Sequence, residues 1–61
     1  MKRRDIIKKL EAAGLTLIEG SNHTKIYRGT KFISAISRRR EIADKLVISI
    51  EKQTGVPLRS P

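Results

Sequence analysis

The segment His23–Arg28, HTKIYR, holds the chain's single histidine beside an ammonium, a phenol and a guanidinium. Histidine suits proton transfer because its unperturbed pKa lies near neutrality, so that both of its protonation states are populated. Lys25 and Arg28 can meet the negative charge of a phosphate, and Tyr27 can stack on an unpaired base or donate its hydroxyl. These residue types would serve metal-free cleavage of RNA, in which the 2′-hydroxyl loses a proton and the 5′-oxygen gains one.

A single imidazole cannot act as base and acid at the same instant. Lys25, Tyr27 or water would take the second role, or the reaction would proceed without it. A missing acid or base lowers the cleavage rate by a factor on the order of 10²–10⁴, so we expect a slow catalyst. A lone histidine in a small domain is more often an ordinary surface residue, and the Lys25–Tyr27 alternation is more often a solvated strand face. Residue types by themselves therefore leave catalysis open.

Two further features predict contacts with phosphates. Small turn-forming residues precede the histidine, and such a turn lets a phosphate approach backbone N–H groups closely; they are Gly20, Ser21 and Asn22. Three consecutive arginines repel one another unless an anion is near, which favours contact with a phosphate backbone; they are Arg38, Arg39 and Arg40. The arginine run indicates a polyanion and nothing finer.

The composition favours nucleic acid as the partner. Among 61 residues, 14 Lys+Arg stand against 6 Asp+Glu, a formal charge of +8. Such a balance favours nucleic acid first, an anionic membrane surface second and an acidic protein third. Without cysteine, disulfides, thiolate metal sites and cysteine nucleophiles are excluded, and one histidine with scattered carboxylates predicts no metal site. A single domain this small has a marginal core, so a protein partner is an expected source of stability.

No segment of the sequence predicts a membrane span. The longest strongly apolar run, Leu46–Ile50, is far too short to cross a bilayer. Met1–Arg4 resembles the start of a signal peptide, but the charges of Asp5 and Lys8–Lys9 come before any apolar core can form. A membrane-active basic helix is a further hypothesis, suggested by the basic N-terminal segment. The mixed charge of that segment argues against it. We therefore expect a cytoplasmic protein without a membrane partner.

Apolar spacing predicts a helix near each end of the chain. The first covers residues 3–13, with an apolar face formed by Ile6, Ile7, Leu10 and Ala13, and Gly14 ends it. The second ends at Gly55, and its expected buried stripe comprises Ile42, Leu46, Val47 and Ile50. Asp44 is a candidate N-cap, although residues 41–42 can already belong to the first turn. Residues 1–55 form the expected domain, and residues 56–61 an expected frayed tail.

Three strands are predicted between the helices, over residues 15–19, 23–28 and 31–36, joined by turns at residues 20–22 and 29–30. The resulting order, α-β-β-β-α, predicts an α+β fold: a three-stranded antiparallel sheet with two helices on one face. If Ile26 points at the helices, then His23, Lys25 and Tyr27 share the uncovered face. For the third strand the inward face stays open between two pairs of residues: Phe32 and Ile36, or Ile33 and Ala35.

Several short motifs occur in a characteristic order between residues 2 and 55. IIKKLEAAGL leads into a strand, GSNH (Gly20–His23) is followed by KIY, REI (Arg40–Ile42) precedes the last helix, and IEKQTG (Ile50–Gly55) ends it. In this order, spacing and chain length, the sequence resembles the HicA toxins of HicA–HicB toxin–antitoxin systems, which are small mRNA interferases. Where members of the family often carry a Pro-Arg-His-like stretch, this chain has Ala35, Ile36 and Ser37. It therefore lacks the second histidine of that stretch.

This resemblance implies a double-stranded-RNA-binding-domain-like fold and places the family's catalytic histidine on His23. It implies endonucleolytic cleavage of mRNA, independent of the ribosome and without a metal or other cofactor. It also implies a HicB-like antitoxin that covers the active site and neutralises the toxin. The alternative is a non-catalytic RNA-binding module with the same fold, in which His23 only contacts the RNA.

Overall fold

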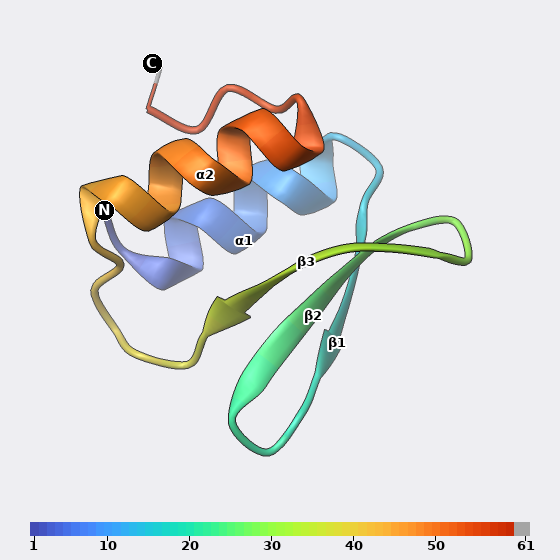
Figure 1. Cartoon of the computed structure of the whole chain (residues 1–61), viewed down its shortest axis with the longest axis horizontal. Coiled ribbons are helices and arrows are strands. Elements are labelled where there is room, and N and C mark those ends of the chain that lie inside the picture. The colour runs from blue at the N-terminus through green and yellow to red at the C-terminus, as the bar shows by residue number, and fades with distance from the viewer. Residues whose placement is uncertain (60–61) are drawn as a thin grey trace.

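The computed structural model of the chain describes residues 1–59 and has the order α-β-β-β-α (Figure 1). The elements are α1 (Arg3–Ala12), β1 (Thr16–Glu19), β2 (His23–Arg28), β3 (Lys31–Ser37) and α2 (Asp44–Thr54). The sheet order is β1-β2-β3, both pairings are antiparallel, and the two helices lie together on one side of the sheet. The predicted α+β class and element order are confirmed.

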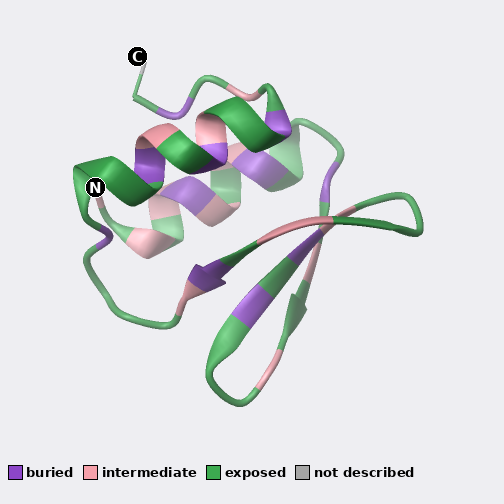
Figure 2. Cartoon of the chain, in the orientation of Figure 1, coloured by how far each residue is buried: buried purple, intermediate pink, exposed green. Residues whose placement is uncertain are grey.

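The core is aliphatic and lies between the helices and the sheet (Figure 2). Its buried apolar side chains come from every element except β1; they are Ile6, Leu10, Leu15, Ile26, Ile36, Ile42, Val47, Ile50 and Leu58. Burying one such side chain contributes about 1.5–3 kcal/mol. Helix α1 contributes Ile6 and Leu10 to this core, and α2 contributes Val47 and Ile50. The sheet face that carries no helix is left to solvent.

Strand β2 lies in the centre of the sheet and alternates as predicted. Thr24 and Ile26 are fully buried, whereas His23 and Lys25 are exposed and Tyr27 is half-buried. On β3, Ile36 lies opposite Thr24 and is buried, whereas Phe32 is 52% exposed. The pairing of β2 with β3 shifts in register between Ile26 and Tyr27, so β3 does not keep one alternation along its length. This shift is why the sequence pattern of β3 was ambiguous.

Helix α2 starts one residue before the position that an Asp44 N-cap would give, and one residue of its predicted buried stripe is exposed. Ala43 is its N-cap and Asp44 its first residue, so the expected side-chain cap at Asp44 is absent. Val47 and Ile50 are buried as predicted, whereas Leu46 is 50% exposed and its predicted burial is wrong. A residue next to Val47 in sequence is turned about 100° around the helix, which brings Leu46 to the margin of the core. Ala13, predicted on the inner face of the first helix, is likewise exposed.

The predicted fraying of the C-terminal segment is wrong for residues 56–59. Leu58 is 0% exposed and belongs to the core. The Glu51 carboxylate accepts hydrogen bonds from the backbone N–H groups of Leu58 at 2.8 Å and Arg59 at 3.0 Å, and Lys9 Nζ donates to the Leu58 carbonyl at 2.9 Å. The last two residues of the predicted tail, Ser60 and Pro61, lie outside the described residues.

Candidate nucleic-acid interface

Three of the candidate site residues lie on the uncovered face of the sheet. His23, Lys25 and Tyr27 alternate with the buried Thr24 and Ile26 along β2, so their side chains leave the strand on the side away from the helices. The side chain of none of the three forms a hydrogen bond or ion pair with another residue of the range 1–59. An imidazole, an ammonium and a phenol are therefore available to a ligand that lies across this face.

The neighbouring strands add apolar surface to this row. In the strand register Ser37 lies opposite His23, Ile18 and Ala35 opposite Lys25, and Thr16 and Phe32 opposite Tyr27. Ile18 is 51% exposed, and the Tyr27 and Phe32 rings meet edge to face with centroids 5.7 Å apart. Exposed rings beside a cation are the arrangement on which unpaired bases stack. Sequence reasoning missed Ile18 and Phe32, although pairing of their strands with Lys25 and Tyr27 was the signal.

Arg28 does not join this group. Its Nη2 donates a hydrogen bond to the Thr54 carbonyl in the last turn of α2. As the neighbour of Tyr27, it leaves the strand on the side of the helices. Carbonyl groups at a helix C-terminus attract cations, so Arg28 has a structural contact there. Its expected phosphate contact beside His23 finds no support in this geometry.

The turn before His23 requires glycine at its first position. The Gly20 N–H donates a 2.8 Å hydrogen bond to the His23 carbonyl, and a Cβ on Gly20 would lie 2.7 Å from that oxygen. Glycine is thus needed for space inside the β1–β2 turn, which is a different reason from the phosphate approach expected from the sequence. Ser21 and Asn22 at the tip are exposed.

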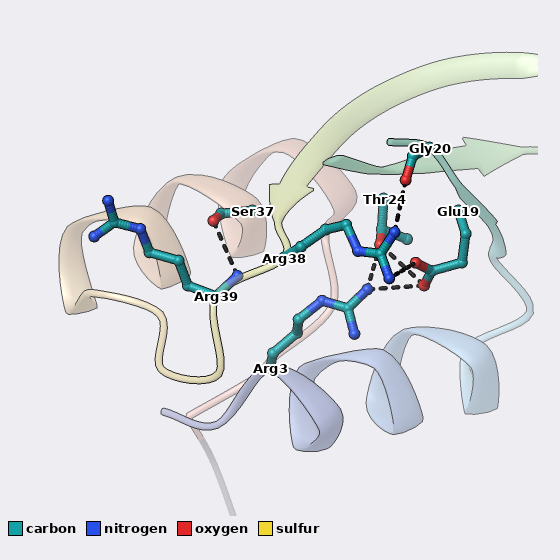
Figure 3. A network of polar contacts seen from close by, with 7 residues as sticks. All are labelled: Arg3, Glu19, Gly20, Thr24, Ser37, Arg38 and Arg39. Atoms are coloured by element: carbon teal, nitrogen blue, oxygen red, sulfur yellow. Dashed lines mark hydrogen bonds and ion pairs between the residues drawn. The ribbon is translucent and has the colours of Figure 1, made fainter. Parts of the chain in front are cut away.

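A network centred on Glu19 supports this turn (Figure 3). Arg3 Nη2 from α1 lies 2.8 Å from Glu19 Oε1, and the Thr24 hydroxyl donates to the same oxygen at 3.1 Å and accepts from Arg3. Arg38 Nη1 donates to the Gly20 carbonyl at 2.9 Å, and its Nη2 lies 3.5 Å from Glu19 Oε2. The hydrogen bonds from Arg3 and then Thr24 hold the pKa of Glu19 below its ordinary value. The carboxylate therefore remains ionised and joins α1, the turn and the segment after β3.

The three consecutive arginines separate into two environments. Arg38 and Arg40 line a pocket of about 580 Å³ whose other lining residues are Lys2, Arg3 and Arg4, and we call it the basic pocket. Arg39 lines a different hollow, beside Ala43 and Leu46. Sequence reasoning treated Arg38–Arg40 as one phosphate-binding run, whereas the structure keeps only two of them together.

Backbone pairing brings the start of the chain to the basic pocket. Lys2 and Glu41 form an antiparallel β-bridge, with Arg3 N–H donating to the Arg40 carbonyl and Ile42 N–H to the Met1 carbonyl, both at 2.9 Å. Pairing between residues this far apart has no local sequence signal. The basic character of residues 2–4 was visible, but their position beside residues 38–40 was not.

Within residues 1–59, no group of three or more His, Cys, Asp or Glu side chains is placed to hold a metal ion. No helix in this range has the length and apolar character needed to cross a membrane.

Comparison of the chain with protein families, with curated proteins and with solved structures finds no match. The residues and their geometry therefore carry the functional assignment.

Proposed function

We propose that this chain is a HicA-like toxin, an endonuclease that cleaves mRNA in the cytoplasm without a metal or the ribosome and so blocks translation. The observation that carries the proposal is the row of exposed His23, exposed Lys25 and half-buried Tyr27 on a sheet face that no helix covers. The formal charge of +8 supports a polyanionic substrate.

In this proposal His23 is the general acid/base. Its imidazole takes the proton of an RNA 2′-hydroxyl, the 2′-oxygen attacks the adjacent phosphorus, and the 5′-oxygen leaves with a proton from water, Lys25 or Tyr27. The ammonium of Lys25 meets the negative charge that develops on the phosphate oxygens. The products are a 2′,3′-cyclic phosphate and a 5′-hydroxyl. Tyr27 stacks on a base or donates its hydroxyl to the same phosphate.

The proposed partner is a HicB-like antitoxin. Ile18 and Phe32, each about half exposed, flank the row that contains His23. Large exposed apolar side chains on a sheet face are typical of a contact surface for another protein. A protein that buries these two side chains would also cover His23 and exclude RNA.

A cleavage assay tests the catalytic role. Wild type and His23→Ala are incubated with one long unstructured RNA in excess chelator, and the product ends are analysed. We expect 2′,3′-cyclic phosphate ends from the wild type and a rate lower by on the order of 10²–10⁴ for His23→Ala, with RNA affinity retained. Thr30→Ala, exposed in the β2–β3 turn, is the control and should cleave like the wild type. Equal loss of binding and cleavage in His23→Ala would remove the catalytic role.

One observation favours the second candidate, a non-catalytic RNA-binding module. Catalytic bases are commonly oriented by a third group, and no residue within the range 1–59 hydrogen-bonds the His23 imidazole. This candidate predicts that the wild type binds the RNA, that His23→Ala loses only the affinity of one contact, and that neither produces cleaved ends.

A further inference from the structure

The basic pocket lies outside the row that contains His23. All five of its lining residues are cationic, two from the segment after β3 and three from the start of the chain, and no apolar side chain lines it. Lys2, Arg4 and Arg40 are exposed and form no side-chain hydrogen bond or ion pair with another described residue. Arg3 and Arg38 share the single carboxylate of Glu19.

This concentration of charge is set by the fold. The β-bridge between Lys2 and Glu41 fixes the backbones of the two basic segments against each other, so their cationic side chains stay in one neighbourhood. Like charges held together in this way destabilise the free protein, and an anion that enters the pocket relieves the repulsion. Guanidinium groups also bind phosphate oxygens through paired donors.

The lining residues decide between kinds of anionic ligand. A protein interface has a core of apolar and aromatic side chains, and a pocket for a free nucleotide has apolar groups against the base. No apolar or aromatic residue lines the basic pocket: its side-chain polar groups are N–H donors on cations, and the apolar part of its wall comes from the aliphatic stems of the same side chains. Contacts of that kind are typical of binding to a nucleic-acid backbone, which positions the strand without reading its bases.

We infer that the basic pocket binds backbone phosphates of the same RNA strand whose cleavage we propose at His23. Arg38 connects the two places, because it lines the pocket and donates to the carbonyl of Gly20 in the turn that precedes His23. A strand that crosses the open face at His23 continues past Arg38 into the pocket. Lys2 and Arg4 are then RNA-binding residues, and the inference rests on the proposed function for the identity of its ligand.

The test measures binding without cleavage. A short fluorescent 2′-O-methyl RNA, which lacks the attacking hydroxyl, is titrated with wild type, Lys2→Gln/Arg4→Gln and the control Lys52→Gln across a range of salt concentrations. Lys52 is exposed in the last turn of α2, and the N-terminus lies near the other end of that helix (Figure 1). Loss of two phosphate contacts should weaken binding on the order of tenfold and lower the salt slope by about 1.4. The control should bind like the wild type.

Three outcomes overturn the inference, and they differ in what they say of the proposed function. If the double variant binds with wild-type affinity and slope, the pocket is not used by RNA, while binding and cleavage at His23 stand. If the wild type does not bind RNA, the proposed function fails as well. If it binds inorganic triphosphate instead, and the double variant does not, the pocket takes a free phosphate ligand.

Discussion

Two carboxylates, Glu19 and Glu51, each hold another segment of the chain and each bind a guanidinium group, but their remaining donors differ: a hydroxyl for Glu19 and two backbone N–H groups for Glu51. Glu51 binds the backbone N–H groups of Leu58 and Arg59, and its side chain is only 17% exposed. Glu19 binds the guanidinium groups of Arg3 and Arg38, and its side chain is 54% exposed. One fastens the chain's C-terminal segment to the core, whereas the other holds cations at the margin of the basic pocket.

The different contacts of Glu51 and Glu19 predict that the first carboxylate acts on stability and the second on the candidate site. Ion pairs between exposed side chains contribute little to folding because water competes for both partners. Hydrogen bonds from backbone N–H groups to a largely buried carboxylate fix the path of the chain, and here they seat Leu58 in the core. We therefore expect changes around Glu51 to act on unfolding, and changes around Glu19 to act mainly on the turn before His23 and on RNA binding.

The largest expected effect is that of Leu58→Ala. Removing a fully buried leucine leaves a cavity and should lower the free energy of unfolding by about 2–5 kcal/mol. Leu46→Ala is the matched control: its side chain is 50% exposed, and the same change should cost less than about 1 kcal/mol. Urea denaturation measures both. Equal destabilisation by the two changes would show that the C-terminal segment is not part of the core.

Gly20→Ala should have the next largest effect. The new Cβ would meet the His23 carbonyl oxygen at 2.7 Å, so the turn must open and lose its closing hydrogen bond. We expect a loss of about 1–3 kcal/mol of stability, as for other overpacked sites. The exposed neighbour Ser21 provides the control, because Ser21→Ala should change stability by no more than about 0.5 kcal/mol. A Gly20→Ala variant as stable as the wild type would contradict the tight turn.

Acid denaturation should distinguish the two carboxylates directly. The N–H groups of Arg59 and Leu58 lower the pKa of Glu51, as Arg3 and Thr24 lower that of Glu19. In both cases the unfolded chain binds more protons, so this stability is present above the unfolded pKa of about 4.3 and is lost as pH falls through the folded pKa. Because solvent screens the more exposed Glu19 carboxylate more strongly, Glu51→Gln should flatten the acid side of the stability profile more than Glu19→Gln. Thermal unfolding across the acid range measures it, and the reverse order would overturn the comparison.

The smallest expected effect is a change in RNA affinity for Glu19→Gln. The substitution removes a negative charge beside the basic pocket and releases Arg3 and Arg38, so binding of 2′-O-methyl RNA should strengthen severalfold. Cleavage should slow at the same time, because the ion pair with Glu19 that keeps Arg38 against the turn before His23 is lost. The charge-matched control is Glu11→Gln, exposed on α1 near the other end of that helix. Parallel changes in binding and cleavage would assign Glu19 a general electrostatic role only.

Much of the fold could be predicted because its signals are local. Helix α1, the three strands and the end of α2 at Gly55 follow from apolar spacing, β-forming residues and turn residues within a few positions of one another. The exposed alternation of His23, Lys25 and Tyr27 came from the same source. The errors at Leu46 and in residues 56–59 have one cause: which of several apolar residues enters a core depends on what packs against it.

The candidate site was predictable to a smaller extent. The sequence indicated the row on β2, because neighbouring positions of one strand have fixed relative directions. It did not indicate that Arg28 would bind the end of α2, that Arg39 would separate from Arg38 and Arg40, or that Lys2–Arg4 would join them. Each of these depends on contacts between elements.

The sequence by itself determined the element order, the aliphatic core, the strong positive charge and the exposure of the single histidine, because composition and short-range periodicity fix these properties. Only the tertiary structure decided that residues 1–3 pair with residues 40–42, that Glu19 binds Arg3 and Arg38 while Glu51 holds residues 58–59 against the core, and that five cations surround one pocket. The physical reason is that backbone pairing and long-range hydrogen bonds depend on where the packed helices and strands place their ends. No stretch of neighbouring residues encodes that placement.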